Sequence, residues 1–360
     1  MDFNEITVKH VRTLKPYQSA RRIGGHGHNF LNANESPKSE GYFINSSSFN
    51  RYPDCQPEEL IERFADYANV HKEQVIATRG SDEALGLIVR TFVESDGSEG
   101  VLIAPPTYGM YEVAARTNNV QVAYAKRHED FSLDADLLLE GVKEASFKIK
   151  AIFIDSPANP LGIVFKKDEL IKLLTALPET LIVLDEAYVE FANKEDDYTD
   201  LVNEYDNLIV TRTLSKAFAL AGIRCGFAIA KPQIIKTMLK VIDPYPICDP
   251  VAQIAIQALT DHGVHMTYAR IMECNRRREQ LEVELKALSI VEKVFESLGN
   301  FLLVKFKDGP AVFDFMAKRG VILRSFEDKP GLKNCVRISI GSNEELDELM
   351  RGLTAFGEQC

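Results

Sequence analysis

The stretch "LIVTRTLSKAFALAGIRCGFAIA" (residues 208–230) begins and ends with a short, mostly apolar run. Apolar runs of four to six residues without alternation suit strands that are buried on both faces of a sheet. Between the two runs stands Lys216, and Arg224 follows it eight positions later. Lysine is rarely buried without a partner, so a lysine in this apolar setting points to a chemical use.

Runs of the same kind recur upstream. They are VIAT (75–78), VLIA (101–104), VQVAYA (120–125), AIFI (151–154) and LIVL (181–184), and helical patterns separate them. Helices that connect successive buried strands are typical of crossover units. Together with the two runs of 208–230, the pattern predicts an α/β fold in which a mostly parallel, seven-stranded sheet is flanked by helices.

A second, smaller α+β lobe is predicted downstream. A helix is expected at 248–259, with Asp249 as its N-cap and Pro250 at its first position. A long charged helix through 270–288, strands at 301–306 and 335–340, and a last helix from about residue 344 follow. We therefore divide the chain into a large domain (30–250) and a small domain (251–360 with 1–29, which includes an N-terminal arm).

The composition excludes several classes of protein. The 360 residues carry a formal net charge of −11, which argues against a nucleic-acid-binding surface. The N-terminus has no signal-peptide pattern, and no apolar run approaches the ~20 residues that span a bilayer. The six cysteines are scattered without C-x-x-C spacing. A reduced, cytoplasmic protein without a metal site or a membrane partner is expected.

Polar and aromatic side chains follow five of the predicted strands. In open parallel sheets, ligands bind beyond the carboxyl ends of the strands. The segments at those ends are 79–83, 105–108, 155–162, 185–188 and 212–216. They offer, in that order, the N–H groups of a helix N-terminus, an aromatic ring, an amide, a carboxylate and an amine. Such a set predicts one convergent site.

Pyridoxal phosphate is the cofactor that needs this set of groups. Lys216 would form the Schiff base with its aldehyde, and Asp185 would keep its ring nitrogen protonated. Tyr108 would stack on the ring, while Asn159 and Tyr188 would address its phenolic oxygen. The phosphate would be held by Ser81, Asp82, Ser215 and Arg224. Once displaced from the cofactor, a desolvated Lys216 beside cations has a lowered pKa and can act as a general base.

Taken singly, each of these residues has a simpler interpretation. A lone lysine after a strand is usually solvated, and Asp185 could cap a helix. Tyr108 and Tyr188 could be half-buried aromatics, and Asn159 before a proline is a common turn residue. Ser81 and Asp82 could merely begin a helix. Their order at successive strand ends, rather than any one of them, favours the cofactor site.

The motifs that carry these residues resemble a known family. They are "LKPYQSARR", "NRYPDCQP", "RGSDEAL", "PPTYGMY", "SPANPLG", "LDEAYVEF" and "TLSKAFALAGIRCGF", in that order. Together they resemble the histidinol-phosphate aminotransferase family of fold-type-I pyridoxal-phosphate enzymes, over almost the whole chain. One motif departs from the family pattern S-P-N-N-P-T-G, because Ala158 and Leu161 replace polar residues beside Asn159.

The resemblance implies a substrate pair and a partner. An amino group would be exchanged between L-histidinol phosphate plus 2-oxoglutarate and imidazole-acetol phosphate plus L-glutamate, in histidine biosynthesis. The enzyme would be a homodimer in which Tyr52 reaches the cofactor phosphate of the other subunit. Arg337 would bind the carboxylate of glutamate. Tyr17 and Arg324 would line the phosphate or side-chain end of the substrate.

Other functions use the same residues. An aromatic amino-acid aminotransferase would keep Arg337 but have a neutral side-chain pocket. A decarboxylase of a phosphorylated amino acid would share the cofactor machinery. A non-catalytic sensor would need a DNA-binding module, for which the chain has no pattern.

The segment "GGHGH" (24–28) contains two histidines, and histidine is a common metal ligand. No acidic partner lies nearby in the sequence, so a flexible loop is the simpler interpretation.

Overall fold

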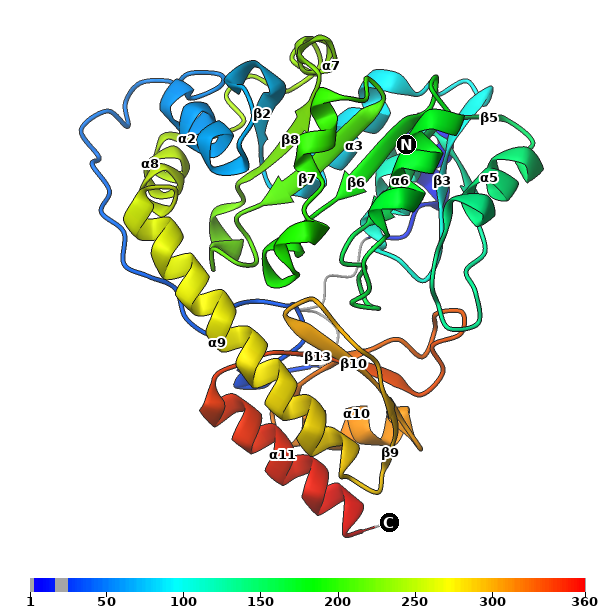
Figure 1. Ribbon diagram of the computed structural model, residues 1–360, viewed down its shortest axis with the longest axis vertical. Coiled ribbons are helices and arrows are strands. Elements are labelled where there is room, and N and C mark those ends of the chain that lie inside the picture. Colours follow the sequence, from blue (N-terminus) through cyan, green and yellow to red (C-terminus); the bar gives the residue numbers. More distant parts are fainter. Residues whose placement is uncertain (1–2, 17–24, 360) are drawn as a thin grey trace.

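The structure is a computed structural model that describes residues 3–16 and 25–359. Its largest feature is a seven-stranded sheet with the strand order β2-β8-β7-β6-β5-β3-β4 (Figure 1). The strands are β2 (Val75–Thr78), β3 (Glu99–Ile103), β4 (Gln121–Tyr124), β5 (Lys148–Asp155), β6 (Leu181–Asp185), β7 (Leu208–Thr213) and β8 (Gly226–Ala230). Strand β8 runs in the opposite direction to the other six strands of this sheet. The predicted α/β fold with a mostly parallel sheet is confirmed.

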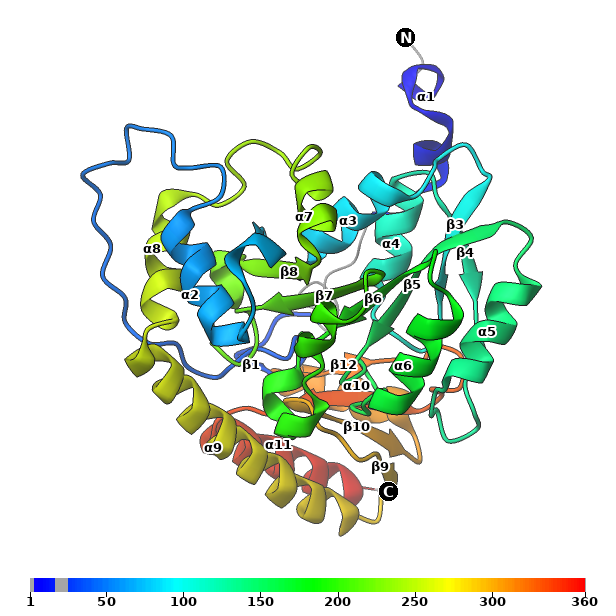
Figure 2. The ribbon, with the colours of Figure 1, turned by 45° about the horizontal axis from the view of Figure 1, so that its top comes forward.

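Helices cover both faces of this sheet because successive strand residues point to opposite sides. One hydrophobic core lies between the sheet and α3 (Ser81–Phe92), α4 (Met110–Thr117) and α7 (Pro232–Met238). The other lies against α2 (Glu58–Ala68), α5 (Ala135–Glu144), α6 (Lys167–Ala176) and α8 (Asp249–Ala258). Figure 2 shows the sheet between these two layers. On β6, for example, Val183 belongs to the first core and Leu184 to the second.

One predicted strand differs from the expected burial. The run at 120–125 suggested a strand buried on both faces, but Gln121 and Tyr124 of β4 are exposed. The reason is position, because β4 is the last strand of the sheet and pairs only with β3. An edge strand needs less apolar surface than a central one.

A smaller antiparallel sheet with the order β12-β13-β10-β9 forms the second part of the molecule. Its strands are β9 (Val291–Val294), β10 (Phe301–Phe306), β12 (Arg324–Ser325) and β13 (Cys335–Ser339), and α10 (Gly309–Lys318) and α11 (Asn343–Gly357) accompany it. The 26-residue helix α9 (Asp261–Lys286) runs from the large sheet to the small one (Figure 1). The division of the chain at residues 30 and 250 stays a prediction.

The N-terminal region contributes short elements. They are α1 (Phe3–Ile6), a 3₁₀ turn (Lys9–Thr13) and β1 (Asn29–Phe30), which pairs in parallel with β11 (Val321–Ile322). Strand β1 is thus docked on the C-terminal part of the chain, in a two-stranded sheet with β11. His28 contributes to this docking, since its Nε2 lies 2.8 Å from Glu348 Oε1 on α11. The acidic neighbour absent from the local sequence is therefore supplied by a distant helix.

Two predicted helix starts are wrong in detail. The N-cap of α8 is Cys248, and Asp249 is already helical. Proline fits either of the first helical positions, so Pro250 did not fix the start, and a carboxylate in the first turn still faces the positive end of the helix dipole. Helix α9 begins at Asp261 behind the N-cap Thr260, which accepts a bond from Gly263 N–H, nine residues before the expected start.

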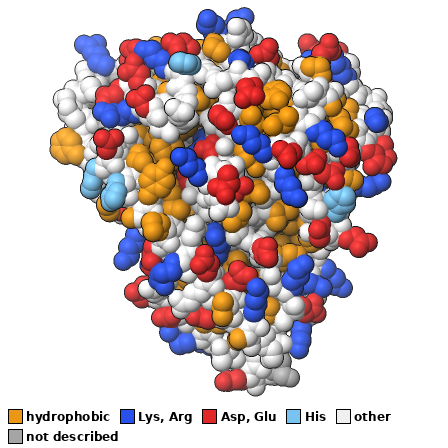
Figure 3. All heavy atoms as spheres, in the orientation of Figure 1, with side chains coloured by type: hydrophobic (Ala, Val, Ile, Leu, Met, Phe, Trp, Pro, Cys, Tyr) orange, Lys and Arg blue, Asp and Glu red, His pale blue; other side chains and the backbone are white. Residues whose placement is uncertain are grey.

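The surface has a mixed character. On the face shown in Figure 3, acidic and basic side chains are interspersed rather than gathered into one patch. Among the described helices, none combines the length and apolarity that crossing a bilayer requires. Within the same residues, histidine, cysteine, aspartate and glutamate side chains form no cluster of three that could hold a metal ion.

Candidate active site

The carboxyl ends of three neighbouring strands place polar side chains side by side. Asp155 ends β5, Asp185 ends β6, and Thr211 lies near the end of β7. Asp185 is the register partner of both Asp155 and Thr211. Because register partners point to the same face, all three side chains lie on the side of the sheet covered by α3 and α4. Two buried carboxylates, those of Asp155 and Asp185, thus lie side by side at the carboxyl ends of neighbouring strands.

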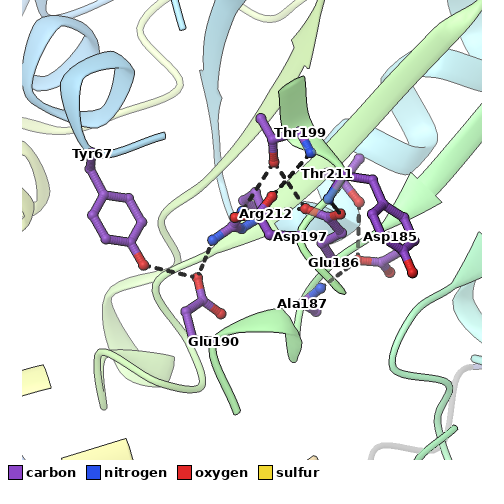
Figure 4. A network of polar contacts seen from close by, with 10 residues as sticks. Tyr67, Asp185, Glu186, Ala187, Glu190, Asp197, Thr199, Thr211 and Arg212 are labelled. Carbon is purple, nitrogen blue, oxygen red and sulfur yellow. Dashed lines mark hydrogen bonds and ion pairs between the residues drawn. The ribbon is translucent and has the colours of Figure 1, made fainter. Parts of the chain in front are cut away.

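Asp185 is held by neutral donors. Its Oδ1 accepts bonds from Thr211 Oγ1 at 3.0 Å and from the Ala187 N–H at 3.2 Å (Figure 4). Its Oδ2 accepts a bond from Tyr111 OH of α4 at 3.0 Å. Burial, together with the charge of Asp155, raises the pKa of Asp185 to about 7. A cation brought to this carboxylate would favour its charged form.

Lys216 lies beyond the end of β7 and is partly buried. Its Nζ donates to the backbone oxygen of Ala33 at 2.9 Å and lies 5.8 Å from the ring centre of Tyr188. Burial and the nearby charge of Arg337 lower the pKa of Lys216 to about 8. An amine with that pKa is largely neutral in mildly alkaline solution, which is the form that attacks a carbonyl.

A group of anion-binding donors lies at the N-terminus of α3. The N-cap residue of α3 is Gly80, which has no side chain to satisfy the first N–H groups of the helix. Arg224 Nη1 donates to Ser215 Oγ at 3.1 Å, and Arg224 Nη2 lies 3.2 Å from Asp82 Oδ2. Asp82 Oδ1 also accepts a bond from Tyr108 OH at 2.8 Å. Helix N–H groups, a hydroxyl and a guanidinium form a typical phosphate-binding set.

Strand β8 passes very close to the first residues of α3. A Cβ atom on Gly226 of β8 would lie 2.5 Å from the Ser81 backbone nitrogen and 2.6 Å from the Gly80 carbonyl carbon. Glycine is therefore required where β8 passes under the start of α3. Ser81 is buried at this junction. The predicted residues Ser81, Asp82, Ser215 and Arg224 thus meet in space.

Arg337 and Asn159 form the other side of the site. Arg337 Nη1 donates to Asn159 Oδ1, and Nη2 donates to the Asn32 carbonyl at 2.7 Å. The guanidinium carbon of Arg337 lies 5.6 Å from the ring centre of Phe326. Arg324, the register partner of Arg337, lies 5.7 Å from the same ring. Two arginines of the small sheet therefore flank one aromatic ring.

The prediction for Tyr188 has a geometric basis as well. Tyr188 is buried beyond β6, and its OH accepts a bond from Asn34 Nδ2 at 2.9 Å. Burial raises the pKa of Tyr188 to about 12, which keeps the phenol protonated and able to donate. Its ring also lies beside Lys216, as described above.

One predicted site residue, Tyr52, lies elsewhere in the described structure. Tyr52 is 83% exposed, and its ring stacks on Tyr245 with the ring centres 4.8 Å apart. Tyr17 falls outside the described residues. The roles of all the site residues remain predictions at this point.

Several residues at the site were not predicted. They are Asp155, Tyr111, Thr211, Ala33 and Asn34. Asp155 and Thr211 carry a usable signal, since each comes at the end of a predicted strand, as Asp185 does. Ala33 and Asn34 lie in a coil segment without periodicity, so no sequence pattern indicates that Ala33 reaches Lys216 or that Asn34 reaches Tyr188.

A cavity of about 310 Å³ opens beside Lys216 on the side of α9. Its lining includes Pro37, Phe191, Arg270 and Ile340, which come from four distant parts of the chain. Arg270 spans it, because its Nη1 donates to the Ala217 carbonyl at 3.0 Å and its Nη2 bonds Glu40 at 3.1 Å. Lys216 therefore lies where the segment before α2, α9 and the start of α11 converge.

Comparison with known proteins agrees with this geometry. The family model for "Aminotransferase class I and II" matches residues 30–353. Histidinol-phosphate aminotransferase of Aeromonas salmonicida is 47% identical over 355 residues, and that of Aeromonas hydrophila is 46% identical, each covering 97% of both chains. The fold is shared with the crystal structure of histidinol-phosphate aminotransferase from Sinorhizobium meliloti in complex with pyridoxal-5'-phosphate.

The Sinorhizobium meliloti enzyme is 22% identical in sequence to this chain, and the structural match covers 98% of each chain with a TM-score of 0.87. At this identity the structural likeness concerns the fold alone, whereas the family rests on the full-length sequence matches. The fold, the lysine beyond β7 and those matches lead to one result. The chain belongs to the class I and II aminotransferases, and within them to the histidinol-phosphate aminotransferase family.

Proposed function

We propose that this enzyme transfers an amino group between L-histidinol phosphate and 2-oxoglutarate, giving imidazole-acetol phosphate and L-glutamate, with pyridoxal phosphate as cofactor. The observation that carries the proposal is the convergence of Lys216, Asp185 and the anion-binding turn of α3 beyond the carboxyl ends of β7, β6 and β2 of one sheet. The choice of substrate is supported by relatives that are 46–47% identical over nearly their full length and bear that name.

The residues present fit the cofactor. Asp155 and Asp185 are two buried carboxylates at one sheet edge, and the donors to Asp185 are all neutral. A protonated ring nitrogen is the cation that such a carboxylate lacks. The turn at Gly80 and Arg224 offers N–H, hydroxyl and guanidinium donors for a phosphate dianion. The carboxylate of Asp82 would orient Arg224 and Tyr108 rather than touch the phosphate, since like charges repel.

When bound, pyridoxal phosphate supplies an aldehyde that condenses with amines and a ring that accepts electrons from the adjacent carbon. Lys216 would hold the aldehyde carbon and, when released, move a proton at the substrate carbon that bears the amino group. Asp185 would retain the proton on the ring nitrogen. Asn159 Oδ1 accepts from Arg337, so its amide nitrogen would be the atom that donates to the phenolic oxygen. Tyr188 would donate to the same oxygen, and Tyr108 would cover the ring.

Arg337 and Arg324 would bind the substrate anions. A guanidinium pairs with either a carboxylate or a phosphate through two parallel hydrogen bonds. One pair of arginines could therefore accept glutamate in one half of the reaction and histidinol phosphate in the other. Tyr17 is assigned to the same end of the substrate by family resemblance.

We further propose a cytoplasmic homodimer in which Tyr52 completes the cofactor site of the partner subunit. Exposed aromatic side chains support it: Phe43, Phe49, Tyr52 and Tyr245 are all at least 45% exposed. Phe43 is 76% exposed on an extended segment whose backbone is held by Gln257, so the ring is presented rather than buried. Clusters of exposed aromatics are typical of interfaces.

The test of the proposed function is the product formed from three amino donors. Cofactor-loaded enzyme with 2-oxoglutarate should form glutamate rapidly from L-histidinol phosphate and slowly from phenylalanine. With O-phosphothreonine, no carbon dioxide should be released. Faster glutamate formation from phenylalanine would establish the aromatic aminotransferase instead, and release of carbon dioxide would establish the decarboxylase.

A further inference from the structure

Asp155 connects three parts of the site, although it is not among the residues assigned to the cofactor. Its side chain is 4% exposed at the end of β5. Oδ1 accepts a bond from Thr107 Oγ1 at 2.8 Å, and Oδ2 accepts a bond from the Asn159 N–H at 2.7 Å. Thr107 directly precedes Tyr108, and Asp155 is the register partner of Asp185. The Asp155 carboxylate thus bonds the turn that carries Tyr108, the predicted stacking ring. It also bonds the loop that carries Asn159, the predicted donor to the phenolic oxygen.

The charge of Asp155 is only partly compensated. Arg127 Nη2 lies 3.9 Å from Asp155 Oδ1, beyond hydrogen-bonding distance. The guanidinium of Arg127 is itself fixed by bonds to the carbonyls of Ala104 at 2.8 Å and Phe131 at 3.1 Å. Asp155 and Asp185 therefore bring two carboxylates to the sheet edge, with one buried arginine behind them. Burial raises the pKa of Asp155, and the charge of Arg127 opposes that rise without a direct hydrogen bond to the carboxylate.

We propose that Asp155 is a positioning residue of the cofactor site, whose carboxylate fixes Thr107 and Asn159 and adds negative charge beside Asp185. The proposal rests on pyridoxal phosphate being the cofactor. Tyr108 would then be held over the ring, and Asn159 beside the phenolic oxygen, by the same side chain. The added charge would strengthen the hold on a protonated cofactor.

The titratable and charged side chains around Asp155 come from several elements of the fold. Asp185 lies on β6, Tyr111 on α4, Tyr188 beyond β6, and Arg127 beyond β4. Asp155 contributes to raising the pKa of Asp185, Tyr111 and Tyr188. Removal of its charge should therefore lower the affinity of the site for protons in general. That effect separates an electrostatic role from a merely structural one.

Two substitutions separate the hydrogen bonds from the charge. Asp155→Asn can keep both contacts, because its amide oxygen accepts from the Asn159 N–H while its NH₂ donates to the Thr107 hydroxyl, which can rotate. That variant loses the charge alone. Thr107→Val keeps the charge and the side-chain shape but removes one of the two hydrogen bonds.

The measurements are the dissociation constant of pyridoxal phosphate, by equilibrium dialysis of the apoprotein, and the pH midpoint of the visible absorbance of the bound cofactor. In Asp155→Asn the midpoint should fall by on the order of one unit, because an anion near the bound cofactor has been removed. In Thr107→Val the midpoint should stay, and the dissociation constant should rise roughly fivefold with the loss of one hydrogen bond.

Variants that match the wild type in both quantities would overturn the proposal, even if their melting temperature falls. If Asp155→Asn does not fold, Thr107→Val decides the positioning role by its dissociation constant. A wild-type protein that binds no pyridoxal phosphate would instead contradict the proposed function, so the two failures can be told apart.

Discussion

At the scale of single residues, the chemistry depends on how burial changes proton affinity. Lys216 and Asp185 are shifted in opposite directions by the same cause, because desolvation disfavours the charged form of each. The pKa of Lys216 falls to about 8, and that of Asp185 rises to about 7. Lys216 is therefore prepared to react as a neutral amine, while Asp185 needs a cationic partner to remain ionised in its site.

The lowered pKa of Lys216 predicts selective labelling of the apoprotein. A base with a depressed pKa loses its proton at lower pH. The neutral amine of Lys216 therefore predominates above about pH 8, rather than only above the higher pKa of an ordinary lysine. Acylation of Lys216 by an amine-specific reagent should rise with a midpoint near pH 8, as measured by peptide mass spectrometry. The exposed Lys148 is the control for the pH dependence of the reagent itself. Equal pH profiles for the two lysines would contradict the assignment.

Arg337 is the residue on which both substrates depend. Replacement by alanine removes a buried guanidinium that would pair with substrate anions. In Arg337→Ala, kcat/KM for both glutamate and histidinol phosphate should fall by about a hundredfold, a loss of roughly 3 kcal/mol. The dissociation constant of pyridoxal phosphate should change far less and serves as the internal reference. Unchanged turnover of both substrates would rule out the assignment.

At the scale of elements, the site depends on how strands and helices approach one another. Gly226 of β8 passes beneath the first residues of α3, and an added Cβ would meet backbone atoms. Gly226→Ala should push the start of α3 away and raise the dissociation constant of pyridoxal phosphate. The matched control is Gly86→Ala within α3, where nothing lies within 4 Å of the added Cβ. That change should raise stability by about 0.5–1 kcal/mol.

Similar effects of the two substitutions on cofactor binding would show that the approach of β8 to α3 does not shape the phosphate end. Cofactor titration and thermal denaturation of both variants measure the difference directly.

Glu186 and Arg212 extend the site to the opposite face of the sheet. Each directly follows a residue of the cofactor side, Asp185 and Thr211, so their side chains point away from α3 and α4. Arg212 Nη2 lies 2.8 Å from Glu190 Oε1, and its Nη1 lies 3.3 Å from Glu186 Oε2 (Figure 4). Glu190 belongs to the 3₁₀ turn Val189–Phe191 that follows Tyr188. This buried network therefore fixes the segment that carries Tyr188.

Arg212→Met should be among the most destabilising single changes. Removal of the guanidinium leaves Glu186 and Glu190 buried without their cation, which costs about 3–5 kcal/mol. Denaturant unfolding at neutral pH measures it, with Arg276→Met on the exposed face of α9 as the control, since its pairing with Glu273 is solvent-exposed and contributes little. Equal stabilities for the two variants would refute the importance of this network.

Much of this arrangement could be predicted from the sequence because the strands are local features. All seven apolar runs became strands of one sheet. Asp185 was found because it directly follows such a run, and Lys216 because it lies five residues after another. The exposure of β4 and the pairing of Asp155 with Asp185 could not be predicted, because both depend on strand order and register. Ala33 and Asn34 reach Lys216 and Tyr188 across more than 150 residues of sequence, and no local pattern encodes that contact.

At the scale of the whole molecule, the proposed dimer accounts for the exposed aromatic segment before α2. Phe43→Asp places a charge where we expect a subunit interface, so it should convert the dimer to a monomer of 40.4 kDa in sedimentation velocity. Cofactor affinity should fall with it, because Tyr52 of one subunit would no longer reach the other. Val283→Asp on α9, where Val283 is 70% exposed, should leave the dimer intact. A wild-type protein that sediments as a monomer would exclude the dimer.

The fold brings distant segments to Lys216, and the most direct test of the proposed function uses that lysine and one substrate. Cofactor-loaded enzyme is mixed with L-histidinol phosphate alone, without 2-oxoglutarate, and separately with phenylalanine, and the visible absorbance of the bound cofactor is followed. We expect a stoichiometric loss of that absorbance with histidinol phosphate at low concentration, a much weaker response to phenylalanine, and no such loss in Lys216→Ala. An absorbance that histidinol phosphate leaves unchanged while another amine removes it would contradict the proposed substrate.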